Sequence, residues 1–150
     1  MFIDKDLYEK ILDSIPVITC DIVIFNKEKS KVLLFKRNNN PLKGVYYTPG
    51  GRVNKNEPLN NAVIRKAKQE LGLELNSFDL KYCGILEEFF DNSSFGKSSS
   101  HHINVVYQYI LNDFNEINLD NQHEEFDWFD INDLSLHFYL KKKINLCKLK

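Results

Sequence analysis

Apolar residues in this chain fall into two patterns, one typical of strands and one of helices. Runs rich in Val, Ile, Leu and aromatic residues, bounded by polar or glycine-containing turns, predict β-strands. Apolar positions spaced three and four residues apart predict amphipathic helices. The predicted strands are 17–25, 31–37, 44–48, 80–90, 103–111 and 126–129; the predicted helices are 4–12, one that starts at 57–58 and ends at 72, and one or two within 131–149.

The stretch around which the rest of the chain is organised is residues 49–73, PGGRVNKNEPLNNAVIRKAKQELGL. Its turn contains Gly50-Gly51, and glycine allows a backbone to adopt positive φ and to approach a ligand closely. In the helix that follows, Arg65, Gln69 and Glu70 project from adjoining parts of one surface. A polar cluster beside a glycine turn suits a hard cation that carries phosphate oxygens.

This stretch resembles the Nudix box: Gly, five residues, Glu, seven residues, then Arg-Glu-apolar-x-Glu-Glu-x-Gly-apolar. Two acids of that template are missing, because Lys66 and Gln69 stand where the box has Glu. The resemblance implies an α/β protein with the Nudix fold, an α/β/α sandwich with a mixed β-sheet, and one domain over residues 1–150. It also implies that this chain holds fewer metal ions than an ordinary Nudix pyrophosphohydrolase. The matching positions are Gly51, Glu57, Arg65, Ala67, Glu70, Gly72 and Leu73.

The reduced box, with similar residues along the chain, resembles the GDP-mannose mannosyl hydrolase branch of this family. Outside the box, the match includes the cluster from Gln122 to Trp128 (QHEEFDW). The resemblance implies one Mg²⁺, with Mn²⁺ as the alternative ion, and a homodimer. Its protein ligands would be the Glu70 carboxylate, the Gln122 side-chain oxygen and the Gly50 backbone carbonyl. The diphosphate of a nucleotide sugar would complete the octahedron that Mg²⁺ prefers.

The same resemblance assigns roles to residues outside the metal site. His123 would deprotonate the attacking water, and a neutral imidazole is available because histidine has an unperturbed pKa near ~6.5. Arg37 and Arg52 would bind the phosphates and offset the charge of the departing diphosphate. Asp21 lies either on a wet strand face or in the sugar pocket. Glu88 stands where related enzymes can carry a sugar-contacting histidine, so the preferred sugar stays open.

The expected reaction is hydrolysis of a GDP-sugar, GDP-mannose or GDP-glucose, at the anomeric carbon. Water would attack from the opposite face of the sugar, giving GDP and free sugar with inversion. Two alternatives stay open. An ordinary Nudix pyrophosphohydrolase would attack at phosphorus and release a monophosphate. An inactive module would bind a nucleotide sugar without turning it over.

Composition limits the partners and the compartment. Hydrophobic residues make up 43% and charged residues 27% of the 150, a soluble globular balance. The net charge of −1 gives no support for nucleic acid or an anionic membrane as a partner. No stretch has the length of a membrane span, and the first ten residues lack a signal-peptide apolar region. Three cysteines without a CxxC spacing predict free thiols in a reducing compartment, so a cytoplasmic location is expected.

Two further groups of residues, a histidine pair and a run of lysines, are not expected to bind metal or take part in catalysis. His101 and His102 are adjacent in a predicted strand, so their side chains should point to opposite faces and make poor joint metal ligands. Residues 141–143 are three lysines near the end of the chain. They suit the C-terminal region of a helix and a solvated face.

Overall fold

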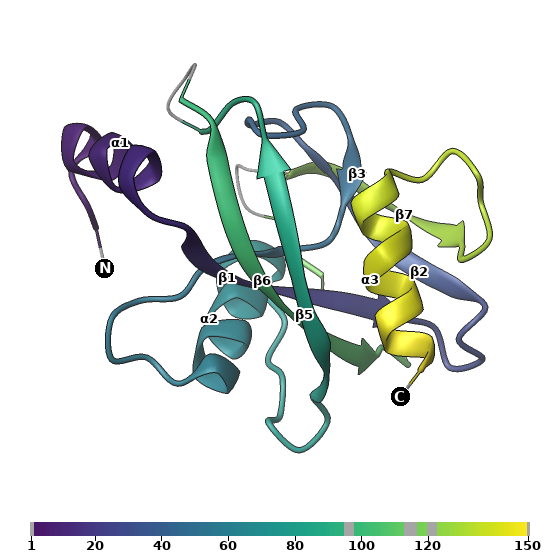
Figure 1. Ribbon diagram of the computed structural model, residues 1–150. Helices are drawn as coiled ribbons and strands as arrows, with labels where there is room; N and C mark the ends of the chain where they lie inside the picture. The colour runs from purple at the N-terminus through teal and green to yellow at the C-terminus, as the bar shows by residue number, and fades with distance from the viewer. Residues whose placement is uncertain (1, 95–97, 113–116, 120–122, 150) are drawn as a thin grey trace.

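A seven-stranded mixed β-sheet forms the centre of the molecule (Figure 1). The computed structural model describes residues 2–94, 98–112, 117–119 and 123–149, and only the backbone of 123 and 124. The strand order is β3-β2-β1-β6-β5, with β4 paired to β1 and β7 paired to β2. The β1–β6 pair is parallel and the other pairs are antiparallel, which confirms the predicted mixed sheet. The strands are β1 (Val17–Phe25), β2 (Lys31–Arg37), β3 (Tyr46–Tyr47), β4 (Gly50–Arg52), β5 (Lys81–Phe90), β6 (Ser100–Ile110) and β7 (His123–Asp130).

Helices α2 (Leu59–Leu71) and α3 (Phe138–Lys148) cover the two faces of the sheet. Alternate residues of β1 show this division, because successive side chains of a strand point to opposite faces. Ile22 and Ile24 belong to the core beneath α2, whereas Val23 and Phe25 belong to the core beneath α3. The predicted α/β/α sandwich is therefore confirmed, with a separate core on each side of the sheet.

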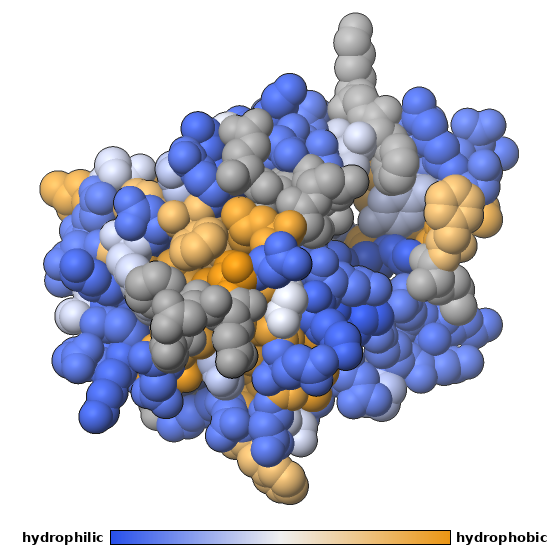
Figure 2. Space-filling model, turned by 180° about the vertical axis from the view of Figure 1, so that it is seen from behind, coloured by the Kyte–Doolittle hydropathy of each residue, from blue (hydrophilic) through white to orange (hydrophobic). Residues whose placement is uncertain are grey.

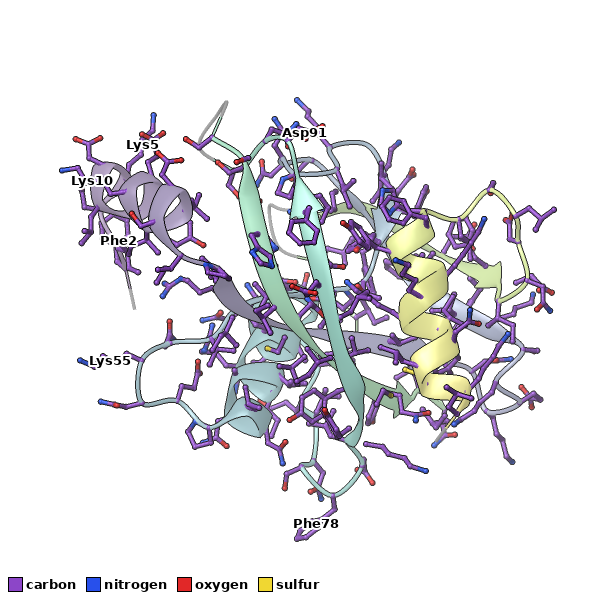
Figure 3. The ribbon with its side chains drawn as sticks, in the orientation of Figure 1. Phe2, Lys5, Lys10, Lys55, Phe78 and Asp91 are labelled. Carbon is purple, nitrogen blue, oxygen red and sulfur yellow. The ribbon has the colours of Figure 1, made fainter. Side chains whose placement is uncertain are left out.

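The first helix, α1 (Lys5–Ser14), stands apart from these layers (Figures 1 and 3). Asp4 caps it by accepting a hydrogen bond from the Asp6 N–H at 3.0 Å. Helix α2 ends at Gly72, which adopts the left-handed conformation with a φ of 67°. That conformation favours glycine, so the expected helix stop is confirmed.

Strand β1 changes partners along its length, and this change positions the candidate site. Its C-terminal end pairs with β2, whereas residues 19–21 pair with β4. The register places Asp21 opposite Gly50. Gly50 and Gly51 were predicted as a turn but form the start of strand β4, so this glycine turn, as we continue to call it, lies against the middle of β1. The predicted strand 44–48 was too long, because only Tyr46 and Tyr47 pair with β2.

The remaining predictions about the whole chain concern its thiols, its surface and a membrane span. All three cysteines are free and buried, as expected. No helix among the described residues has the length and apolarity needed to cross a bilayer. Seen from behind, the surface is mostly hydrophilic, with apolar side chains gathered near its middle (Figure 2).

Candidate active site

A cavity of about 210 Å³ lies beside the glycine turn, and side chains of both charges line it. Arg37 comes from the end of β2, Arg52 from β4 and Lys66 from α2. Asp21 of β1 and Glu88 of β5 supply the carboxylates. The structure thus brings the predicted Arg37, Arg52 and Asp21 to one place, together with the backbone of Gly50. It adds Lys66, which sequence reasoning treated only as a missing acid.

Glycine is required in the turn because both neighbouring elements approach its backbone closely. A Cβ on Gly50 would lie 2.2 Å from Asp21 Oδ1. A Cβ on Gly51, whose φ is 155°, would lie 2.8 Å from Cε of Lys66. The Gly50 N–H donates to Glu70 Oε2 at 3.0 Å, so the turn is tied to α2.

The Glu70 carboxylate is buried, with the residue only 2% exposed. One oxygen accepts the hydrogen bond from Gly50, and the other forms an ion pair with the Lys66 ammonium, one helical turn earlier. The Lys66 side chain is 13% exposed. The Lys66 ammonium therefore contacts Glu70, the one predicted carboxylate ligand. Lys66 itself stands at a position where the Nudix box carries a glutamate.

Among the described residues, Glu70 is the predicted carboxylate ligand that lies at the cavity beside Gly50. No group of three or more His, Cys, Asp or Glu that could hold a metal occurs among the described residues. Glu70, beside the Gly50 backbone, supplies hard oxygen at the cavity wall, and Mg²⁺ takes its other ligands from water or phosphate. Gln122, the third predicted ligand, lies outside the described residues.

Glu57 is held by Arg65 in an ion pair with two hydrogen bonds. Arg65 Nε donates to Glu57 Oε1 at 2.6 Å, and Arg65 Nη2 donates to Oε2 at 2.8 Å. These hydrogen bonds from Arg65 lower the pKa of Glu57 to about 2. Nη2 of Arg65 also donates to the backbone oxygen of Arg52 at 3.1 Å. The pair therefore fixes the end of β4, which carries Arg52.

Lys143 is fully buried, so the prediction that it lies on a solvated face was wrong. Its ammonium lies 2.5 Å from Asp21 Oδ2 and 2.7 Å from Glu88 Oε1. It also donates to the Tyr47 hydroxyl at 3.1 Å, and that hydroxyl donates to Glu88 Oε1 at 2.5 Å. Asp21 is 6% exposed, so its alternative placement on a wet face was wrong as well.

The Lys143 ammonium is thus the counter-ion of two buried carboxylates, Asp21 and Glu88. The pKa values of these two acids are shifted in opposite directions. Burial favours the neutral form of Asp21, but the Lys143 ammonium outweighs it and lowers the pKa of Asp21. Burial raises the pKa of Glu88, and the Asp21 charge adds to this effect while Lys143 opposes it. Glu88 is therefore the acid that more readily takes a proton.

The two arginines are oriented by local contacts. Arg37 Nε donates to the backbone oxygen of Pro41 at 2.9 Å. The Arg52 guanidinium lies over the Tyr8 ring, 5.6 Å from its centroid, a cation–π contact. His123 is the first residue of β7, and its backbone pairs with Arg37 in the strand register. The structure therefore places the His123 backbone beside a residue that lines the cavity.

The adjacent histidines of β6 face different surroundings. His102 lines the cavity, and burial lowers its pKa to about 4, so it is neutral at pH 7. His101 Nε2 lies 3.2 Å from Glu87 Oε1, and its ring stacks on Phe89. The two side chains therefore have different neighbours, as expected for adjacent residues of a strand.

The sandwich and the glycine turn tied to α2 define a protein of the Nudix fold. This chain belongs to the NUDIX domain family, whose sequence model matches residues 16–147. It is 33% identical to "Low-salt glycan biosynthesis protein Agl8" of Haloferax volcanii over 144 residues, 95% of this chain and 89% of that protein.

Two further comparisons differ in how much they cover. An "ADP-ribose pyrophosphatase" of Methanocaldococcus jannaschii is 41% identical over 69 residues, 46% of this chain and 40% of that protein. The crystal structure of a MutT NUDIX hydrolase from Burkholderia pseudomallei aligns with a TM-score of 0.73 at 24% identity, covering 89% of this chain and 98% of that one. That structure confirms the fold.

Proposed function

We propose that this protein hydrolyses a nucleotide sugar at the anomeric carbon, with Mg²⁺, to a nucleoside diphosphate and free sugar. Membership of the NUDIX domain family supports a Nudix hydrolase, and the likeness to a protein named for glycan biosynthesis supports a sugar substrate. The observation that carries the proposal is the acid content of the site. Glu70 is paired with an ammonium, and Lys66 and Gln69 stand where the Nudix box carries further acids.

That acid content favours attack at carbon over attack at phosphorus. Attack at phosphorus requires water to be activated beside a metal cluster, and two further carboxylates near the glycine turn are already held by cations. Glu57 is bound by Arg65, and Asp21 is bound by Lys143. Attack at the anomeric carbon requires instead that the departing diphosphate be stabilised. Mg²⁺ held by Glu70 would supply part of that positive charge when bound.

The side chains of the chain itself supply the rest of this stabilisation. Arg37 and Arg52 line the cavity, and guanidinium groups bind phosphate oxygens in bidentate fashion. Arg52 is held in place by its backbone bond to Arg65 and by the Tyr8 ring. Positive charge that is fixed before the reaction stabilises a developing anion without reorganisation.

The remaining part of the cavity suits a sugar. Asp21, Tyr47 and Glu88 line it, and the Lys143 ammonium contacts all three side chains. Carboxylates accept hydrogen bonds from sugar hydroxyls. The volume of about 210 Å³ is below the roughly 300–1,000 Å³ of pockets that enclose a whole drug-sized ligand. We therefore assign the cavity to one sugar unit and the adjacent phosphate.

His123 is proposed as the general base, and GDP-mannose or GDP-glucose as the substrate. The support is the resemblance of the 122–128 cluster to GDP-mannose mannosyl hydrolases, together with the backbone pairing of His123 and Arg37. Gln122 completes the proposed metal ligands with Glu70 and the Gly50 carbonyl. We also propose that the protein forms a homodimer and is located in the cytoplasm.

A panel of nucleotide sugars, incubated with Mg²⁺ and separated by anion-exchange chromatography, tests this function. GDP-, UDP- and ADP-linked hexoses should be compared at equal concentration, with ADP-ribose as the substrate of the rival reaction. The proposal expects a nucleoside diphosphate and free sugar, fastest with a GDP-hexose. A nucleoside monophosphate with a sugar phosphate would contradict it.

An ordinary Nudix pyrophosphohydrolase is the second candidate. It is favoured by the similarity of 69 residues to a protein named ADP-ribose pyrophosphatase. Under this alternative, ADP-ribose in the panel should give AMP and ribose 5-phosphate. The absence of turnover for every substrate, with binding retained, would instead support an inactive binding module.

A further inference from the structure

We propose that Lys66 is a built-in competitor of the divalent cation at Glu70 and thereby sets the metal affinity of the site. This inference rests on the proposed metal-binding role of Glu70, but not on which bond is cleaved. Lys66 is a positioning residue in this account, because it acts through the carboxylate that it occupies. On metal binding, the ammonium must leave that carboxylate oxygen.

The geometry shows that the lysine is built into the site. Lys66 and Glu70 lie four residues apart on α2, the spacing at which side chains meet on one helix face. Oε2 of Glu70 is held by the Gly50 N–H, so the ammonium takes the other oxygen, Oε1. A metal ion that binds Oε1 therefore meets the lysine ammonium at the same oxygen.

Glycine at position 51 makes room for this lysine. A Cβ there would lie 2.8 Å from Cε and 3.2 Å from Nζ of Lys66, so any other residue would push the lysine end aside. The side chain lines the cavity, so the displaced ammonium has open volume into which it can move. The ion pair is also poorly screened, because Glu70 is 2% exposed.

The electrostatic consequence has a definite sign. An ammonium beside a carboxylate cancels most of the charge that attracts a divalent ion. Replacing Lys66 with a neutral side chain of similar length restores that charge, so metal binding should become tighter. Most substitutions of a merely structural residue weaken binding, so a gain in affinity distinguishes the competitor from a structural support.

The test is Mn²⁺ binding to the substrate-free protein, measured by electron paramagnetic resonance of the free ion. Lys66→Met should bind Mn²⁺ about tenfold or more tightly than wild type, given the strength of a poorly screened ion pair. Lys66→Arg keeps the charge and should stay within about threefold of wild type. Lys68→Met is the matched control, because Lys68 lies on the same helix and pairs with the exposed Glu74. It should change Mn²⁺ affinity by less than about twofold.

Two outcomes overturn the inference: Lys66→Met binding Mn²⁺ no more tightly than wild type, or Lys66→Arg gaining as much affinity as Lys66→Met. If Lys66→Met does not fold, Lys66→Gln is measured in its place under the same criteria. The experiment contains no substrate, so its result is independent of the product analysis. Tighter Mn²⁺ binding together with monophosphate products would refute the proposed function and leave this inference standing.

Discussion

The buried ion network around Lys143 gives the sharpest prediction about stability. Lys143→Met removes the ammonium that lies 2.5 Å from Asp21 and 2.7 Å from Glu88 while preserving most of the side-chain volume. Two buried carboxylates then lose their counter-ion. Breaking a buried pair by removal of one partner costs about 3–5 kcal/mol in other proteins. A domain of this size has an unfolding free energy of about 5–15 kcal/mol, so this variant should lose a large share of it.

Three observations keep the expected loss from being larger than this range. Glu88 already has a raised pKa and can take a proton, which removes one of the two charges. Asp21 keeps a hydrogen bond from the Thr48 hydroxyl at 2.9 Å. The methionine side chain fills the space of the lysine stem, so no large cavity is added.

The pH dependence of the loss has a definite sign. Without Lys143, burial raises the pKa values of Asp21 and Glu88 above their values in the unfolded chain. The folded variant then binds more protons than its unfolded state, so its stability falls as the pH rises. The deficit relative to wild type should therefore be larger at pH 8 than at pH 5.

Urea unfolding, followed by the fluorescence of the single tryptophan, measures these values. Lys142→Met is the matched control, because the neighbouring Lys142 is exposed and its ammonium lies over the rings of Phe138 and Tyr139. It should cost less than about 1 kcal/mol. Lys143→Met with Glu88→Gln should recover at least about 1 kcal/mol of the loss, because the second change removes an unpaired charge. A loss for Lys143→Met no larger than that of the control would refute this reasoning.

Three further predictions concern the site. His123→Gln should lower kcat by about 10²–10⁴ if the imidazole is the general base, and a steady-state rate within about threefold of wild type would remove that role. Glu70→Gln should raise the Mg²⁺ concentration for half-maximal rate by at least about tenfold, and an unchanged requirement would exclude Glu70 as a ligand. Glu57→Gln should lower the unfolding free energy by about 1–3 kcal/mol at pH 7, because it loses charge-assisted hydrogen bonds from Arg65. Since the pKa of Glu57 is lowered from 4.5 to about 2 in the folded protein, this difference should shrink as the pH falls through that window, and a difference independent of pH would contradict the pairing.

The sequence contained the signals for most of the fold because they are local. The apolar run of 17–25 and the polar turn after it predicted two strands with the observed bounds. Gly72 predicted the end of α2, since the residue after a helix often adopts the left-handed conformation, which glycine takes up without strain. The box spacing predicted that Glu70 would lie near the glycine turn, and the hydrogen bond to Gly50 shows it.

The buried charges were harder to predict because they depend on contacts between distant segments. Lys143 lies three residues after Leu140 and four before Cys147, on the apolar face of α3. That spacing was the signal that the lysine is buried, but three consecutive lysines indicated a solvated face instead. Asp21 lies in a strand that is buried almost throughout, and the nearly continuous apolar run around it was the signal against a wet face, although both placements were left open.

The pairing of Lys66 with Glu70 shows a different limit. The spacing of four residues made the contact foreseeable. What the sequence could not show is that the Gly50 N–H already occupies one carboxylate oxygen and that Gly51 leaves space for the lysine. The competition between ammonium and metal follows only from these three contacts together.

The central claim is that water attacks the sugar carbon and not a phosphorus. Hydrolysis of the best substrate of the panel in ¹⁸O-labelled water, followed by mass spectrometry of both products, tests it most directly. The account predicts one ¹⁸O atom in the free sugar and none in the nucleotide. Label in a phosphate group, with unlabelled sugar, would contradict it.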